Sequence, residues 1–174
     1  AIPCRSVQSD RLVARSYQMV LADTLELLHI LAVFTLLGAL GLTTYSSIMV
    51  ARTNEVRDFK IYVGLGEAGG MVAALSTVAI GVFGVLAAWK IGYTLNDGWL
   101  VAAYIATVAV LVVPALTFKR WGEKVAELMP RALEEDRILP EQLEILTATK
   151  YRITEMFMYS MLVFIAYVMV FKPF

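Results

Sequence analysis

The sequence predicts an all-α integral membrane protein, a bundle of four transmembrane helices. Apolar residues make up 59% of its 174 residues and charged residues 17%, whereas about a quarter of the residues in a soluble domain are charged. The alternative is four buried helices of a large soluble protein, but such helices would need a shell of amphipathic helices around them, which this chain lacks. Four long stretches also contain no Asp, Glu, Lys or Arg: Leu27–Ala51, Ala68–Trp89, Gly98–Phe118 and Met156–Phe171.

The lengths of these stretches set the expected spans. A helix needs roughly 20 apolar residues to cross the hydrocarbon core, and the first three stretches satisfy this directly. The fourth is shorter, but Ile153 and Thr154 extend it and Lys172 can reach outward to the interface. We therefore expect one membrane domain over residues 1–174, with spans at about 27–51, 68–89, 98–118 and 153–171.

Two segments outside the spans are also expected to be helical. Apolar residues recur at helical spacing within residues 1–23, which predicts a short helix on the membrane surface. In the third loop, residues 119–152, an apolar edge contains Trp121, Val125, Leu128 and Met129. Pro140 followed by Glu141 resembles a helix start, and we expect that helix to continue into the fourth span. Pro114 is expected to kink the third span.

The distribution of charge predicts the orientation. Ten of the 15 basic residues lie in the first and third loops, and five lie in the second loop and at the two ends of the chain. The positive-inside rule then places both loops in the cytoplasm and both termini outside. The 15 acidic residues balance the basic ones, so no bulk field favours nucleic acid as a partner. Cys4 is the only cysteine, which excludes an internal disulfide and favours a free thiol.

His29 is the only histidine and lies near the outer end of the first span. An ionisable group at membrane depth is a functional candidate by default, here as a haem or copper ligand with Asp97 or Met169 as a partner at the same end. The alternative is a structural histidine bonded to a neighbouring helix or head group. The eight methionines include Met156, Met158 and Met161, but their spacing has no metal geometry.

Five charged residues border the spans, and a run of hydroxyls lies in the first. Because helix starts favour acids and helix ends favour bases, we expect capping and interhelical ion pairs; the alternative is an entry site for protons or ions. The hydroxyls of residues 43–47 could bond to neighbouring helices or line a solute path. The charged residues are Arg52 closing the first span, Glu67 opening the second, Lys119 and Arg120 closing the third, and Glu155 opening the fourth.

A row of small residues marks one face of the second span. In lipid, small residues allow close backbone approach and dense dispersion contact between helices. The row therefore predicts a close contact with another helix of this chain, the first or the third span. Its members are Gly70, Ala74, Thr77, Gly81, Gly84 and Ala88.

Three short motifs resemble those of a known family: Leu27-Leu28-His29-Ile30 at the start of the first span, Gly98-Trp99-Leu100 at the start of the third, and Met169-Val170-Phe171-Lys172-Pro173 at the end. Over residues 24–174 the chain resembles a bacterial family of small four-helix predicted integral membrane proteins. That family is distantly similar in layout to CopD-type copper-resistance membrane proteins. The resemblance implies the four-helix layout, places His29, Trp99, Lys172 and Pro173 at recurring family positions, and implies no reaction.

No catalytic motif is present. His29 has no thiol partner at its depth, and the glycines of residues 64–70 do not follow a strand, so they do not form a nucleotide loop. The leading hypothesis is a non-enzymatic accessory or structural subunit of a larger complex in the bacterial inner membrane, possible settings being respiratory or photosynthetic assemblies. Its partners would be lipid and other membrane subunits. The alternatives are a haem- or copper-handling protein centred on His29 and a small-solute transporter, which would require a water-filled cavity at mid-membrane.

Overall fold

The computed structural model describes residues 5–173, with side-chain surroundings from residue 19 onward. Over these residues the protein is helical and without strands, and four of its helices are long and apolar enough to cross a membrane. The predicted fold class is confirmed. The helices are α1 (Arg5–Val50), α2 (Val56–Ile91), α3 (Gly98–Glu134), α4 (Pro140–Thr147) and α5 (Thr149–Phe171).

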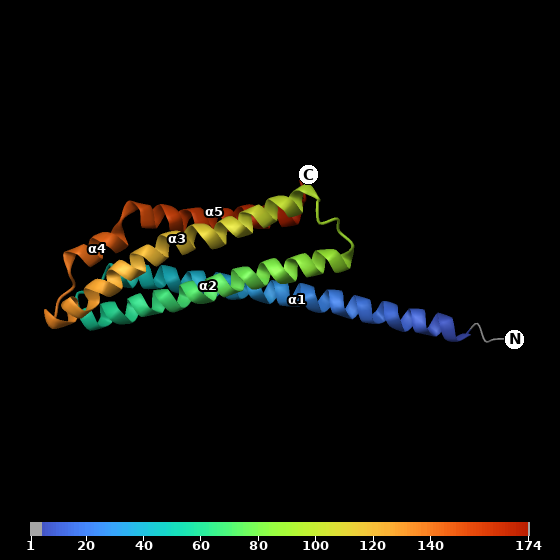
Figure 1. Cartoon of the computed structure of the whole chain (residues 1–174), viewed down its shortest axis with the longest axis horizontal. Helices are drawn as coiled ribbons and strands as arrows, with labels where there is room; N and C mark the ends of the chain where they lie inside the picture. Colours follow the sequence, from blue (N-terminus) through green and yellow to red (C-terminus); the bar gives the residue numbers. More distant parts are fainter. Residues whose placement is uncertain (1–4, 174) are drawn as a thin grey trace.

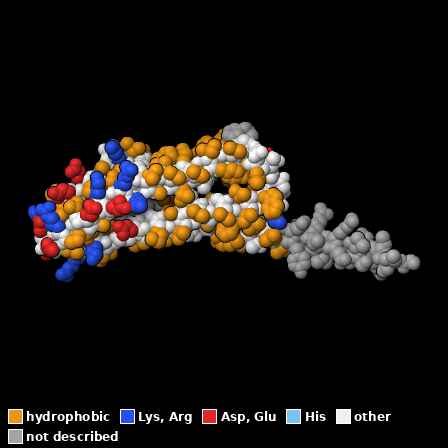
Figure 2. Space-filling model, viewed as in Figure 1, with side chains coloured by type: hydrophobic (Ala, Val, Ile, Leu, Met, Phe, Trp, Pro, Cys, Tyr) orange, Lys and Arg blue, Asp and Glu red, His pale blue; other side chains and the backbone are white. Residues whose placement is uncertain are grey.

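The long helices form two pairs. α1 packs along α2 and α3 packs along α5, so that Figure 1 shows two layers joined by the loop between α2 and α3. An opening between the layers is visible in Figure 2, where apolar side chains cover the middle of the bundle and charged ones gather at one end. We call this the charged end. It contains the loop between α1 and α2, the end of α3, and α4.

Several helix boundaries differ from the prediction. The expected N-terminal surface helix is continuous with the first span as α1, which projects beyond the bundle in Figure 1. The side chains of residues 1–18, and all of Cys4, fall outside the described part. α3 continues past its apolar stretch and through Pro114 without a break. The fourth span is separated from α4 at Ala148, whose extended backbone (ψ 137°) interrupts the expected continuous helix.

The turn after α2, the start of α3 and Lys172 near the C-terminal end of the chain form one cluster. Gly92 ends α2 in the left-handed region (φ 97°), which glycine adopts without steric cost. The amide of Tyr93 then donates to the Ala88 carbonyl, and the Tyr93 and Trp99 rings meet edge to face at 5.2 Å. Lys172 donates to the Tyr93 hydroxyl and lies over both rings. Trp99 is therefore a buried packing residue, whereas Trp89 is 59% exposed as expected of an interfacial aromatic.

At the charged end a small core connects α2, α3 and α4. Phe59 of α2 and Val125 of α3 are almost completely buried in one cluster with Met129, and Leu128 borders a second with Ala132. The expected apolar edge of the third loop thus packs inward. Gln142 of α4 is fully buried; its Oε1 accepts from the Leu139 amide at 3.2 Å and its Nε2 donates to the Val125 carbonyl at 3.4 Å.

Glycines of α2 allow polar groups of α1 to reach its backbone. Ser46 donates to the Tyr62 carbonyl at 2.5 Å, and a Cβ added to Gly66 would lie 2.7 Å from the Ser46 oxygen. A helical side chain covers the turn preceding its own Cα, so any larger residue at 66 would occupy the path of this bond. The absence of a side chain at Gly66 keeps α1 and α2 in close contact.

Candidate functional site

A cavity of about 940 Å³ lies between the two helix pairs, toward the charged end. α1 and α5 supply most of its hydroxyls, and α2 and α3 supply small and apolar residues. The lining includes the uncharged polar side chains of Thr43, Thr44, Ser46, Ser47, Thr77, Tyr151 and Tyr159, the charged ones of Glu67, Lys119, Glu123, Arg152 and Glu155, and the apolar ones of Val110, Leu111, Pro114, Phe118 and Trp121.

The polar wall is a set of hydrogen bonds between α1 and α5. The Thr44 hydroxyl donates to Glu155 Oε1 at 3.0 Å and lies 2.5 Å from the Tyr159 hydroxyl. Tyr159 is also 3.4 Å from the Leu40 carbonyl, and Ser47 lies 3.2 Å from the Tyr151 hydroxyl. These side chains bridge helices whose backbones do not otherwise pack closely.

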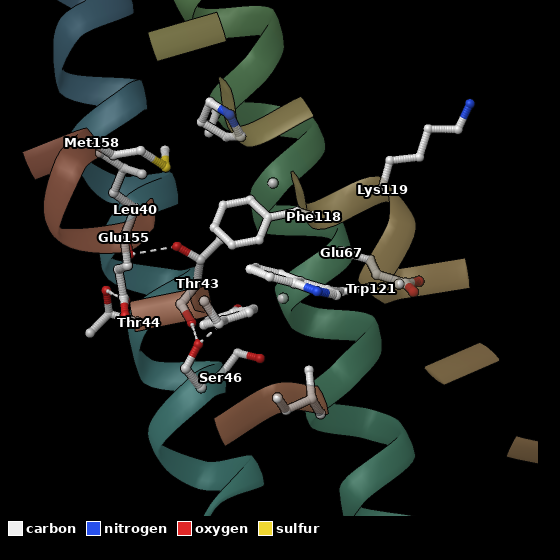
Figure 3. Close-up of a pocket in the computed structure, with 18 of the residues that line it drawn as sticks. Leu40, Thr43, Thr44, Ser46, Glu67, Phe118, Lys119, Trp121, Glu155 and Met158 are labelled. Atoms are coloured by element: carbon white, nitrogen blue, oxygen red, sulfur yellow. Dashed lines mark hydrogen bonds between the residues drawn. The ribbon is translucent and has the colours of Figure 1, made fainter. Parts of the chain in front are cut away.

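A group of aromatic rings adjoins the polar wall and shares Tyr151 with it. Tyr151 lies 4.9 Å from Phe118 and 5.3 Å from Trp121, and Phe118 and Trp121 are 5.8 Å apart, all between ring centroids. In Figure 3 the rings of Phe118 and Trp121 project from α3 toward α1, where Thr43 and Thr44 lie. We call Phe118, Trp121 and Tyr151 the aromatic cluster. It places π faces beside the hydroxyls and the Glu155 carboxylate.

Small residues of α2 and a proline of α3 explain why space is left here. Gly70 has no neighbouring atom within 4 Å of an added Cβ, and both it and Ala74 line the cavity. On α3, Pro114 has no amide hydrogen, so the Val110 carbonyl loses its usual helical donor. Both residues line the cavity.

Four of the five interfacial charges lie within helices and do not cap them as predicted. Glu67 lies within α2, Lys119 and Arg120 within α3, and Glu155 follows the first turn of α5, because the helices continue past the apolar stretches that suggested their ends. Arg52 alone follows the end of its helix, in the turn after Val50.

The expected interhelical ion pairs are also absent from residues 19–173, where the ion pairs found are Lys119–Glu123, Arg131–Glu135 and Arg137–Glu135. In Figure 3, Glu155 and Glu67 lie on opposite sides of the Trp121 ring, and Lys119 points away from the cavity.

His29 contacts α2 outside the cavity. Its Nδ1 lies 3.0 Å from the Ile80 carbonyl, and a Cβ added to Gly84 would lie 3.0 Å from the ring. Since a carbonyl only accepts, Nδ1 carries the hydrogen and donates. Of the suggested metal partners, Asp97 precedes α3 and Met169 packs at the cluster around Trp99. Met156 is 69% exposed and Met158 is 8% exposed, so the two side chains lie in different environments and do not form one site.

The predicted small-residue face of α2 divides into two parts. Gly84 packs against His29 of α1, and a Cβ added to Gly81 would lie 3.9 Å from the Thr107 side chain of α3. Ala88 and Thr77 are buried. Gly70 and Ala74 border the cavity, as Thr77 also does. α1 also packs tightly on Gly66 and Gly69 of α2. A Cβ added to Gly69 would lie 3.2 Å from the Ala39 carbonyl oxygen. Those two glycines lie on a neighbouring face that the spacing argument did not select.

Comparison with known proteins gives one match. A family model described as "Predicted integral membrane protein (DUF2269)" matches residues 23–173. The chain belongs to the DUF2269 family. No curated protein and no solved structure matches the chain.

The DUF2269 match covers every helix that lines the cavity. It begins within α1, at the part that enters the bundle, and ends after Lys172. All described cavity residues, the His29 contact and the Lys172 contact therefore lie inside the family region. The predicted family resemblance is confirmed to this extent, and the family description places the chain in a membrane.

Sequence reasoning identified part of the cavity. It selected the hydroxyls of α1, Glu67 and Glu155, but treated the acids as caps. It missed Tyr151, Tyr159 and Phe118, which are distant from Thr44 in the sequence and reach it through pairing of α5 with α1 and α3. The available signal was the spacing of Tyr151, Glu155 and Tyr159, which recur every four residues and therefore share one face of a helix.

Proposed function

We propose that this membrane protein is non-catalytic and binds a small amphipathic solute in the cavity between its helix pairs, as part of moving that solute across or out of the bilayer. The observation that carries the proposal is the cavity of about 940 Å³ with hydroxyls and a carboxylate on one wall and apolar side chains on the other. Ligand sites are commonly concave, mostly apolar and oriented by a few polar groups. The small-solute alternative from the sequence thus gains a specific site.

The distribution of charge supports an orientation for this site. The charged end contains the two loops that carry most of the Lys and Arg residues, so by the positive-inside rule it faces the cytoplasm of a bacterial inner membrane. The cavity would then open toward the cytoplasmic half of the bilayer. A solute could reach it from that leaflet or from the cytoplasmic interface.

The test is retention of small molecules by the chain and by a variant with a filled cavity. Gly70→Phe places a ring in open space within the cavity and should abolish binding of co-purifying small molecules, measured as mass shifts by native mass spectrometry. Gly64→Phe is the matched control, because Gly64 lies on the same helix, has open space around it and does not line the cavity. A wild-type chain without bound molecules, or one indistinguishable from Gly70→Phe, would contradict the proposal.

A second candidate is the accessory-subunit role in a larger membrane complex. It is favoured by the part of α1 that projects past the other helices in Figure 1, because a projecting helix offers a surface on which a helix of a partner subunit can pack. Gentle extraction followed by native mass spectrometry should then show a stoichiometric second protein, lost on deletion of residues 1–18. Extraction of the chain without any associated protein, even under the mildest conditions, would exclude this role.

A further inference from the structure

We propose that the cavity selects amphipathic organic cations, each carrying one fixed positive charge on an apolar chain. The charge would lie between Glu155 and the aromatic cluster, and the chain would lie along the apolar residues of α3. This inference rests on the proposed function, because it names the class of solute that the cavity takes.

The first argument is charge complementarity. Glu155 Oε1 accepts from the Thr44 hydroxyl, but none of the ion pairs found in residues 19–173 involves Glu155. The lining contains two basic residues, Lys119 and Arg152. Lys119 lies 3.9 Å from Glu123 and points away from the cavity, and Arg152 is exposed and takes no part in the ion pairs found there. A partly desolvated carboxylate without a cationic partner is costly, and a ligand cation would supply that partner.

The second argument is the position of the aromatic cluster. Its three rings lie within 4.9–5.8 Å of one another between centroids, and Tyr151 precedes Glu155 by one helical turn on α5. The face of an aromatic ring carries negative electrostatic potential, so stacked or tilted rings attract quaternary ammonium groups. A cation placed beside this cluster meets a carboxylate and π faces together.

The third argument concerns the remaining wall and the route of entry. Val110, Leu111 and Ala115 of α3 line the cavity with apolar side chains only. On the side between α2 and α3, Gly70, Met71 and Ala115 are exposed, at the depth of apolar spans. An alkyl chain could therefore enter from lipid while its charged head remains near the interface.

The proposal can be tested with three probes that share a ten-carbon chain: decyltrimethylammonium, decyl sulfate and decanol. The full chain in phosphatidylcholine nanodiscs would be titrated while Trp fluorescence is followed, with Trp121→Phe identifying the signal from the cavity. We expect the cation to bind at least about 10-fold more tightly than the sulfate. Glu155→Gln should weaken cation binding about 10-fold and leave decanol binding unchanged, because Gln still accepts from Thr44.

Glu144→Gln is the control for loss of an acid elsewhere, since Glu144 is exposed on α4 and does not line the cavity; its affinities should equal those of the wild type. Equal binding of all three probes to the wild type and to Glu155→Gln would overturn the cation preference and leave the proposed function standing. An equal loss of cation affinity in Glu144→Gln would also overturn it. No binding of any probe, with Gly70→Phe behaving as the wild type, would overturn both proposals.

Discussion

At the scale of residues, a glycine four positions after a carbonyl recurs where α1 meets α2. Gly66 leaves the Tyr62 carbonyl open to Ser46, and Gly84 leaves the Ile80 carbonyl open to His29. A side chain on a helix lies over the residue four positions earlier, so glycine is what allows a polar group from the partner helix to approach. Ser46 and His29 of α1 thus donate hydrogen bonds to backbone carbonyls of α2.

Gly84→Ala should destabilise the protein despite the better helix propensity of alanine. The added methyl group would lie 3.0 Å from the His29 ring, and overpacking typically costs about 1–3 kcal/mol, more than the roughly 1 kcal/mol that alanine contributes in a helix. The measurement is the free energy of unfolding in mixed micelles. Gly64→Ala, with open space around it, should be neutral or stabilising; equal effects of the two variants would contradict the packing account.

Glu135 should titrate at lower pH than an ordinary glutamate. Hydrogen bonds from Arg131 and then from Arg137 lower the pKa of its carboxyl, with Arg131 Nε at 2.7 Å from Oε1. Since the folded-state pKa is lowered, the favourable interaction is present above the usual pKa of glutamate and is lost as pH falls through the lowered value. Arg131→Gln should raise the pKa of Glu135 in a ¹³C NMR titration, whereas the remote Arg120→Gln should not.

At the scale of elements, the apolar stretches predicted where the membrane lies but not where the helices end. The second and third stretches begin or end at charged residues, yet α2 starts at Val56 and α3 continues to Glu134. A charge marks the interface without breaking a helix, because the backbone hydrogen bonds continue in water. Glu67 and Lys119 are therefore within helices, and the predicted caps were wrong.

One buried amide, that of Gln142, joins α4 to α3 by hydrogen bonds beside the apolar core, which makes its contribution to the docking of α4 testable. Gln142→Leu would leave the Leu139 amide and the Val125 carbonyl without their side-chain partner in a fully buried site, and an unsatisfied buried group costs about 1–3 kcal/mol. Hydrogen exchange should increase at residues 139–147 and remain unchanged along α1. The exposed Glu141→Leu is the control; protection of α4 retained in Gln142→Leu would show that apolar contacts suffice.

At the scale of the whole molecule, the orientation rests on charge alone. With Cys4→Ser as the background, Asn96→Cys should react with a membrane-impermeant maleimide in intact cells, because it lies in the loop between α2 and α3. Glu135→Cys, at the charged end, should react only after the membrane is opened. The reverse labelling would invert the orientation while leaving the four spans intact.

The sequence by itself determined the four spans, their order and the family region, because transfer of apolar segments into lipid depends on local composition and length. It also located the hydroxyls of α1 and the small residues of α2. Only the tertiary structure decided that Gly70 and Ala74 border a cavity while Gly84 contacts His29, since membrane helices pack through specific shape and hydrogen bonds rather than through a general hydrophobic drive. For the same reason Thr44, Glu155 and Tyr159 meet only when α5 is placed beside α1.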